Sequence, residues 1–422
     1  IRTETGELIT PIIRQEYDAS GHEILRIDAE GHRTETKYNV YGKPIHIIHP
    51  NDLEERFIYT LSGDLICHID TANIETHYEY DYLRHIISKA TYAKGQELAR
   101  ETNRYIGHHL VSTTDAEGNK TMYSYDKAGR KISETCGEET SFYEYDALGR
   151  VFRIRQGSEI TTKTFDLLDR VIQEEQTSLS GELLKKIRYG YDSAGNKNST
   201  TFFVADGTSQ ETCLYNALNR IIEKTNADGF QERIYYEDVL NEEGQKVLQK
   251  THTDSLRLQT IETFDTHGRL SKIEKRKSKT LSLTHKFYTP KGLLALQVDT
   301  IFSPNGTSRE SRVRWEYDAM GRNIKLIEAE GTPDAKITHK AYTPRGELAK
   351  LTKPDGTEVF YTYNDLNQLI LIHSSDGTVH HEMSYNRLGH LQTSDGLVRK
   401  TDAKGRVLSE TFPLGHSIQN TF

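Results

Sequence analysis

The chain has 422 residues, of which 35% are hydrophobic, and its mean hydropathy is -0.69. A typical globular domain is about 45–50% apolar, so this chain has little material for a deep core. Its 24 Tyr and 13 Phe nevertheless exclude a disordered composition, which would be poor in aromatic residues. This combination favours much surface and little core, as in a solenoid, a ribbon or a hollow shell.

Charge and cysteine content exclude further classes of protein. The net charge is -8, from 54 basic and 62 acidic residues that are interspersed along the chain. No basic patch is dense enough to neutralise phosphates, so we expect no nucleic-acid partner. Cys67, Cys136 and Cys213 lie far apart and form no C-x-x-C pair. We therefore expect neither a disulfide framework nor a metal site, and each cysteine is interpreted as a lone thiol.

The sequence shows no recognisable signal peptide or membrane-spanning segment. No run of about 18 apolar residues is present, which predicts no membrane-spanning helix. The chain opens at Ile1 without an initiating Met or a visible signal peptide, and it starts and stops inside a repeat pattern. We expect residues 1–422 to form a single repeat region that is a fragment of a longer protein.

A six-residue motif recurs along the chain, and Tyr145-Asp146-Ala147-Leu148-Gly149-Arg150 is one clear copy. The spacing is mostly 20–21 residues and stretches between Tyr191 and Tyr317, where we expect insertions to lengthen loops on one edge. Degenerate copies are expected at Tyr105 and Tyr236. The sixteen clear copies begin at Tyr17, Tyr38, Tyr59, Tyr80, Tyr125, Tyr145, Phe165, Tyr191, Tyr215, Phe264, Tyr288, Tyr317, Tyr342, Tyr363, Tyr385 and Thr401.

The residue types within the motif predict a tight turn. Position two is Asp, Asn or Thr in every clear copy, which suits the first residue of a type I turn. Position five is Gly in twelve copies and Asp169, Asn219 or Asn367 in three others, all types that tolerate positive φ, and only Arg84 breaks the rule. The motif therefore predicts a β-hairpin turn with a glycine bulge.

Further turns lie between the motifs, for example at Asp115–Gly118 and Asn226–Gly229. Two turns in each period leave two strands of roughly six residues. Tyr143 and Tyr145 are two apart, so they share a sheet face, and we expect the aromatic residues to form a ladder of neighbouring rings. No segment holds a 3.6-residue apolar period, so we predict an all-β fold of tandem hairpins. A β-propeller is the rival architecture, but it would need about ten blades, more than the usual four to eight.

Written as Y-D-x-x-G-R, the repeats make this chain resemble the RHS/YD-repeat family, which includes bacterial RHS proteins, the B and C subunits of Tc toxins and the YD shell of teneurins. The resemblance covers about residues 17–408 and implies hairpins joined in a continuous sheet that spirals into a hollow shell. The copies that carry it best are Tyr125, Asp126, Gly129 and Arg130; Tyr145, Asp146, Gly149 and Arg150; and Tyr317, Asp318, Gly321 and Arg322.

The resemblance also implies a function. In bacterial members the shell commonly encloses a C-terminal toxin, which is released at a D-P-x-G segment. The present sequence contains no Asp-Pro dipeptide, so self-cleavage is not assigned to it. We expect a secreted or cell-surface shell wall whose partners are its own C-terminal payload or neighbouring shell, and a component of a delivery system. The alternative is an extracellular adhesion or carbohydrate-binding surface, with Trp315 as the candidate that would stack on a glycan.

No pattern of residues predicts catalysis, a cofactor or a metal. The motif Asp residues are explained as turn caps, and the sequence holds no G-x-S-x-G, P-loop or dinucleotide fingerprint. Adjacent residues on a strand point to opposite faces, so His108-His109 and His380-His381 are poor chelators, and His46 and His49 differ in strand parity. We expect each motif Arg to pair with an acidic residue of a neighbouring hairpin or to cover an aromatic ring.

Overall fold

A computed structural model describes residues 10–204, 207–241 and 243–420. These residues form 37 β-strands and one 3-10 turn, and no α-helix occurs among them, which confirms the all-β prediction. Across these ranges, the structure contains no helix of the length and apolarity that a membrane span requires.

The first 23 strands are β1 (Arg14–Tyr17), β2 (Glu23–Ile27), β3 (Arg33–Tyr38), β4 (Pro44–His49), followed by η1 (Pro50–Asp52), β5 (Leu53–Tyr59), β6 (Leu65–Ile69), β7 (Ile74–Tyr80), β8 (Ile86–Ala93), β9 (Gln96–Ile106), β10 (His109–Thr114), β11 (Lys120–Tyr125), β12 (Lys131–Cys136), β13 (Glu139–Tyr145), β14 (Val151–Gln156), β15 (Glu159–Phe165), β16 (Val171–Ser178), β17 (Leu183–Tyr191), β18 (Lys197–Val204), β19 (Gly207–Tyr215), β20 (Ile221–Thr225), β21 (Gln231–Leu240), β22 (Lys246–Thr253) and β23 (Gln259–Phe264). The remaining strands are β24 (Leu270–Arg276), β25 (Thr280–Tyr288), β26 (Leu294–Phe302), β27 (Ser308–Tyr317), β28 (Asn323–Glu328), β29 (Lys336–Tyr342), β30 (Leu348–Thr352), β31 (Glu358–Tyr363), β32 (Leu369–Ser374), β33 (His380–Tyr385), β34 (Leu391–Ser394), β35 (Leu397–Thr401), β36 (Val407–Thr411) and β37 (Ser417–Gln419).

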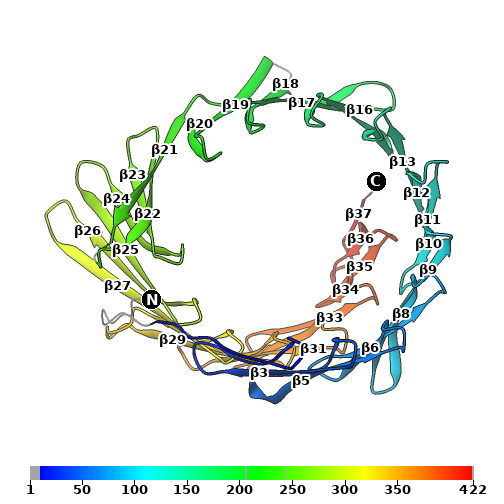
Figure 1. The fold of residues 1–422 in the computed structure, drawn as a ribbon, viewed down its shortest axis with the longest axis horizontal. Coiled ribbons are helices and arrows are strands. Elements are labelled where there is room, and N and C mark those ends of the chain that lie inside the picture. The colour runs from blue at the N-terminus through cyan, green and yellow to red at the C-terminus, as the bar shows by residue number, and fades with distance from the viewer. Residues whose placement is uncertain (1–9, 205–206, 242, 421–422) are drawn as a thin grey trace.

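Each strand pairs antiparallel with the next strand along the chain, from β1 and β2 to β36 and β37. The ladder has no break that would divide it into propeller blades. It curls around an open centre instead, and strands from β29 onward return beside β3 to β6 (Figure 1). The structure therefore has the continuous, spiralling sheet of hairpins that the sequence predicts, and the propeller is wrong.

The motif turns have the predicted geometry. In the turn between β13 and β14, Gly149 has a φ of 84°, and its N–H donates to the carbonyl of Asp146 at 3.0 Å. The strand register shifts between Glu144 and Tyr145, which is the expected bulge. Positive φ also occurs at Arg84, with a value of 67°, so the one exception in sequence adopts the same backbone conformation.

The longer repeats between Tyr191 and Tyr317 differ from the prediction. The added residues lengthen strands and not loops, since β21 and β27 each have 10 residues while the turns remain short. Tyr236 lies in the middle of β21, and its turn follows only after Leu240. Residues added in pairs to both arms of a hairpin gain ladder hydrogen bonds, whereas a longer loop would leave its backbone groups to solvent and cost closure entropy.

The core is thin, as expected from the composition. Leu296 is 2% exposed and is the largest fully buried side chain of the described residues, and the other buried apolar side chains are few, with one group of four on β6 to β8. A single curved layer has no second layer against which to bury a whole face. The cohesion of the wall therefore depends on contacts between consecutive hairpins.

Candidate functional site

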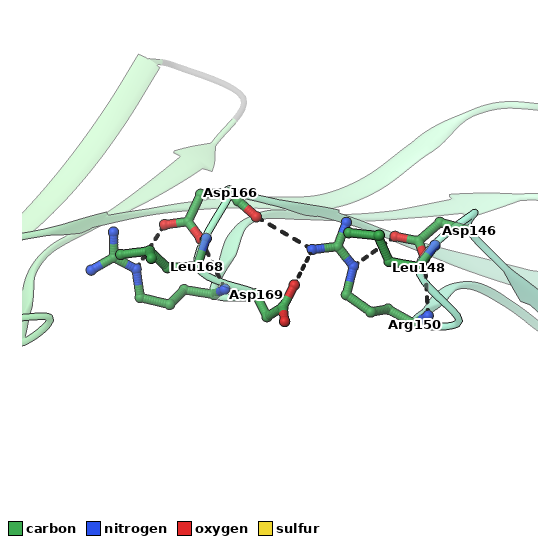
Figure 2. A network of polar contacts seen from close by, with 7 residues as sticks. Asp146, Leu148, Arg150, Asp166, Leu168 and Asp169 are labelled. Atoms are coloured by element: carbon green, nitrogen blue, oxygen red, sulfur yellow. Dashed lines mark hydrogen bonds and ion pairs between the residues drawn. The ribbon is translucent and has the colours of Figure 1, made fainter.

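The turns of the motif form one edge of the sheet, which we call the motif edge, and the turns between motifs form the opposite edge. At Asp146 on the motif edge, Oδ1 accepts the N–H groups of Leu148 at 3.0 Å and Arg150 at 2.9 Å. Its Oδ2 accepts the Arg150 Nε–H at 2.7 Å (Figure 2). These bonds, the backbone N–H of Arg150 first, outweigh burial and lower the pKa of Asp146 below its usual 3.8. Both carboxylate oxygens are thus used to hold the turn.

The same arrangement recurs in the other two strong copies. Asp126 and Asp318 each accept two turn N–H groups through Oδ1 and the Nε–H of their own Arg through Oδ2, at 2.7 Å. Gly129 and Gly321 have φ values of 79° and 81°. The three copies are therefore equivalent structural units.

The sixth motif position covers the aromatic ring that opens the next repeat. The Arg130 guanidinium lies 4.6 Å from the ring centroid of Tyr145, and the Tyr145 hydroxyl donates to the Lys131 carbonyl at 2.6 Å. The hydroxyl groups of Tyr125 and Tyr317 bond in the same way to carbonyls one hairpin back. The pattern extends to Arg150 on Phe165, Arg170 on Tyr191, Arg220 on Tyr236, Arg269 on Tyr288, Arg322 on Tyr342, and the imidazoles of His22 on Tyr38 and His85 on Tyr105.

This pattern corrects the expected ladder of neighbouring aromatic rings. Over the described residues, a motif ring whose preceding motif ends in Arg, Lys or His stacks with that side chain instead of with another motif ring, and His109 stacks on Tyr125 in the same way. Tyr105 and Tyr236 occupy the same place as the other first-position rings, which identifies them as members of the series. Arg130, Arg150 and Arg322 thereby join their own turn Asp to the next hairpin's ring.

The four clear copies without Gly at position five use that side chain as a lateral link. Arg84 Nε donates to Asp64 at 2.8 Å, and Asp169 pairs with Arg150 (Figure 2). In every case the partner is the sixth residue of the preceding motif. The other two pairs are Asn219 with Asn196 and Asn367 with Glu347.

The sequence-predicted ligand candidates do not form a common site. Trp315 lies on β27, is half-buried and faces Leu326 across the ladder, so its role in glycan binding stays a prediction. His46 and His49 bond to different carboxylates, Glu54 and Glu55. The two histidine doublets also separate, because His108 meets His85 while His109 stacks on Tyr125, and His380 meets Glu382 while His381 meets Asp395.

One group was missed from the sequence. Cys67 on β6 and His77 on β7 are paired residues of the ladder, and Glu75 lies two residues before His77. Their ligand atoms all lie within 4.8 Å of one another. The sequence gives no C-x-x-C or H-x-x-H spacing here, so only the strand register could have found this group.

The coils of the spiral meet along a seam, which joins the opposite edge of the first coil to the motif edge of the second. Lys291 Nζ lies 2.8 Å from Asp28 Oδ2, and Arg345 Nε donates to Asp70 at 2.6 Å. Further along, the Arg387 N–H bonds to Glu117, and Lys404 and Arg406 pair with Glu139.

The seam keeps one register throughout. The turn after β2 meets the turn after β25. In the same way, the turns after β6, β10 and β12 meet the turns after β29, β33 and β35, so the offset is 23 strands each time. At each of these contacts the first coil supplies a carboxylate and the second coil a basic or N–H group, and beside Asp70 the Thr71 hydroxyl also donates to the Pro344 carbonyl at 3.1 Å. The hydrogen bonds from Lys404 and Arg406 lower the pKa of Glu139, so this carboxylate is charged at neutral pH.

A comparison with known protein families finds a repeat family that matches part of the chain. The family model described as RHS Repeat matches residues 107–141, which span the motif from Tyr125 to Arg130. A curated relative, "Probable deoxyribonuclease RhsA" from Dickeya dadantii (strain 3937), is 27% identical over 142 residues. That match covers 30% of this chain and 9% of the relative, so the chain spans only a small part of it.

Several of the solved structures that are similar to this chain are Tc toxin structures. The crystal structure of TcdB2-TccC3 is 16% identical over 96% of this chain and 24% of that one, with a TM-score of 0.47. The Photorhabdus luminescens Tc holotoxin pore is 16% identical over 97% of this chain and 25% of that one, with a TM-score of 0.42. The repeated motif and the match of residues 107–141 to the RHS Repeat family support the predicted resemblance of this chain to the RHS/YD-repeat family.

Proposed function

We propose that this chain is a wall segment of a shell that encloses a polypeptide payload, a toxin, until delivery. The observation that carries the proposal is the curled sheet around an open centre, whose coils are joined by the seam (Figure 1). A thin hydrogen-bonded sheet buries little core per residue but surrounds a large volume. A seam between coils leaves few gaps through which a protease could reach the contents.

We also propose that residues 1–422 carry no catalytic site. Each strong motif Asp has its oxygens engaged by its own turn, which leaves no free carboxylate for acid or base chemistry there. The curated relative's name refers to deoxyribonuclease activity, but the match covers 9% of that protein. We therefore propose that activity in the complete protein belongs to residues outside this wall.

The proposed partners follow from the same reading. The payload is a segment of the parent chain itself, beyond these residues, and a delivery-system component and neighbouring shell complete the assembly. We propose a secreted or cell-surface location, because enclosure serves a cargo that must cross from one cell to another. Nucleic acid is not among the proposed partners, since the net charge is -8 and the densest basic run, around Lys275-Arg276-Lys277, is short.

The test uses the full-length parent protein and limited proteolysis. We expect the segment encoded after Phe422 to include an unrelated domain that resists protease in the native protein and is digested rapidly once expressed alone. A variant with Arg345→Glu in the seam should expose it. The proposal is wrong if no further domain is encoded, or if that domain is cleaved equally fast in the native protein and in isolation.

A further inference from the structure

We propose that Cys67, Glu75 and His77 form a binding site for one Zn²⁺ ion that bridges β6 and β7. The three side chains lie on the same face of the sheet, because Cys67 and His77 are paired across the ladder and Glu75 is two residues from His77. They offer one sulfur, one nitrogen and one oxygen ligand. Metal binding at this site can be tested separately from the proposed enclosure function.

The distances fit a tetrahedral ion. A sulfur and a nitrogen bound to the same Zn²⁺ lie about 3.5 Å apart, given bond lengths of about 2.3 Å and 2.0–2.1 Å. Cys67 Sγ and His77 Nε2 are 3.7 Å apart. Glu75 Oε2 is 2.8 Å from the same Nε2, so the carboxylate needs to move outward by roughly half an ångström to become a ligand.

The short hydrogen bond of the group joins His77 to Glu75 at 2.8 Å, while the Cys67 sulfur lies 3.7 Å from the same ring nitrogen. His77 Nε2 faces both the Cys67 sulfur and the Glu75 carboxylate. A ring nitrogen that carries a proton donates to the carboxylate and has no lone pair for the thiol, whereas a bare nitrogen accepts from the thiol and faces the carboxylate without a proton. A divalent cation between the three atoms is attractive to all of them at once.

The surroundings hold the ligands without competing for them. Cys67 is 5% exposed, and the ring of Tyr92 packs edge-on against His77 at 4.9 Å between centroids. The nearby guanidinium of Arg100 is held by Glu97 at 2.7 Å and by the Tyr92 hydroxyl at 2.7 Å, so its charge is already compensated.

The fourth coordination position opens towards solvent. A cavity of about 420 Å³ adjoins the group and is lined by Ile58, Tyr92 and Arg100 among others. A water molecule is the natural fourth ligand there. Thiolate and imidazole ligands favour zinc over Mg²⁺ or Ca²⁺, which prefer oxygen.

The bridge would brace the seam. The chain between Cys67 and His77 contains the turn whose Asp70 accepts the hydrogen bond from Arg345 in the second coil. A cation held at both ends of this hairpin fixes the two strands that present the turn.

The experiment is a titration of the metal-free, reduced chain with CoCl₂, followed by displacement with ZnCl₂. Cobalt bound to a thiolate gives a sulfur-to-metal charge-transfer band in the near ultraviolet, which reports the cysteine directly. We expect one Co²⁺ to bind per chain with this band, Zn²⁺ to abolish it, and MgCl₂ to leave it unchanged. Cys67→Ser should remove the band, and His77→Gln and Glu75→Gln should weaken binding about 10-fold or more.

Cys136→Ser and Cys213→Ser are the matched controls, since they remove the other two thiols, and both should keep the band. Far-ultraviolet circular dichroism establishes that each variant retains its β-structure. The proposal is overturned if the wild-type chain gives no charge-transfer band. It is equally overturned if the folded Cys67→Ser variant keeps the band or if Cys136→Ser or Cys213→Ser loses it.

Discussion

At the scale of single residues, the fifth motif position requires a positive φ whichever residue occupies it. Gly149, Asn219 and Arg84 have φ values of 84°, 57° and 67° although their side chains differ. The sequence predicted this for Gly and Asn but not for Arg84. Arg84 is explained by its bond to Asp64, because an ion pair across two turns offsets part of the cost of positive φ.

Gly149→Val should therefore destabilise its hairpin by about 1–2 kcal/mol or more, because a β-branched residue is strained at positive φ. A Cβ at this position would meet only Arg130 Nη1, at 3.8 Å, so the cost comes from the backbone and not from a clash. Gly149→Asn is the matched control and should cost much less. Thermal melts of the two variants measure this, and equal losses would contradict the turn geometry.

Arg84→Gly should have different effects in two backgrounds. In the wild type it relieves backbone strain but loses the ion pair with Asp64, so little net change is expected. In an Asp64→Ala background the pair is already absent, and the same substitution should stabilise. Urea unfolding of the four proteins gives the coupling between the two residues, which solvent screening keeps small for an exposed pair. Identical effects of Arg84→Gly in both backgrounds would rule out the link.

At the scale of strands and hairpins, the sequence predicted the turns. It did not predict which side chains of neighbouring hairpins contact one another. Asp146 and Gly149 act within four residues of each other, so residue preference alone identifies their turn. The ring of Tyr145 is covered by Arg130 from the preceding motif, and that contact depends on the strand register. The extra length of β21 was misassigned to a loop because added residues look alike in sequence whether they extend a strand or a turn.

Tyr145→Phe tests the bond between consecutive hairpins. It removes the hydroxyl that donates to the Lys131 carbonyl at 2.6 Å and keeps the ring under Arg130. We expect a loss of about 1 kcal/mol, the usual net value of one such bond. Tyr143→Phe is the control, since its hydroxyl reaches Glu134 only at 3.5 Å and should contribute little. Hydrogen exchange at the amides of β12 and β13 reports the change locally, and an equal response to both variants would argue against the assigned role.

For the whole molecule, the seam is the feature that sequence reasoning could not reach. The curvature that brings β25 back to β2 accumulates over 23 strands, and small changes in twist at each pair decide where the coils meet. The residues that form the contact carry no motif of their own. Their complementary charges became visible only when the register placed Asp28 opposite Lys291 and Asp70 opposite Arg345.

Acid should weaken the seam at Asp28. Burial alone would raise the pKa of this carboxyl, but the hydrogen bonds from the Lys291 ammonium and from the N–H groups of His32 and Glu30 outweigh it and lower the pKa from 3.8 to about 2. A carboxylate with a lowered pKa stabilises the folded state above its unfolded pKa. That contribution is lost as pH falls from about 3.8 through about 2. Hydrogen exchange at the turns of Asp28 and Lys291 should rise in this window. Asp28→Asn keeps an oxygen that can accept the turn N–H groups, and it should remove this pH dependence. If the hydrogen-exchange profile of Asp28→Asn against pH matches that of the wild type, Asp28 is not the titrating group.

Charge reversal at the other strong contact tests whether the seam closes the wall. Arg345→Glu places a carboxylate against Asp70, so the pair becomes repulsive and the second coil should separate from the first. Small-angle scattering should then show a larger radius of gyration. The double variant Asp70→Arg with Arg345→Glu restores opposite charges and should restore the compact form. Arg233→Glu reverses a charge that pairs with Glu223 within the first coil, and it should leave the scattering curve unchanged. If the coils stay together in Arg345→Glu, or if the swapped pair fails to rescue them, attraction between these edges does not hold the wall closed.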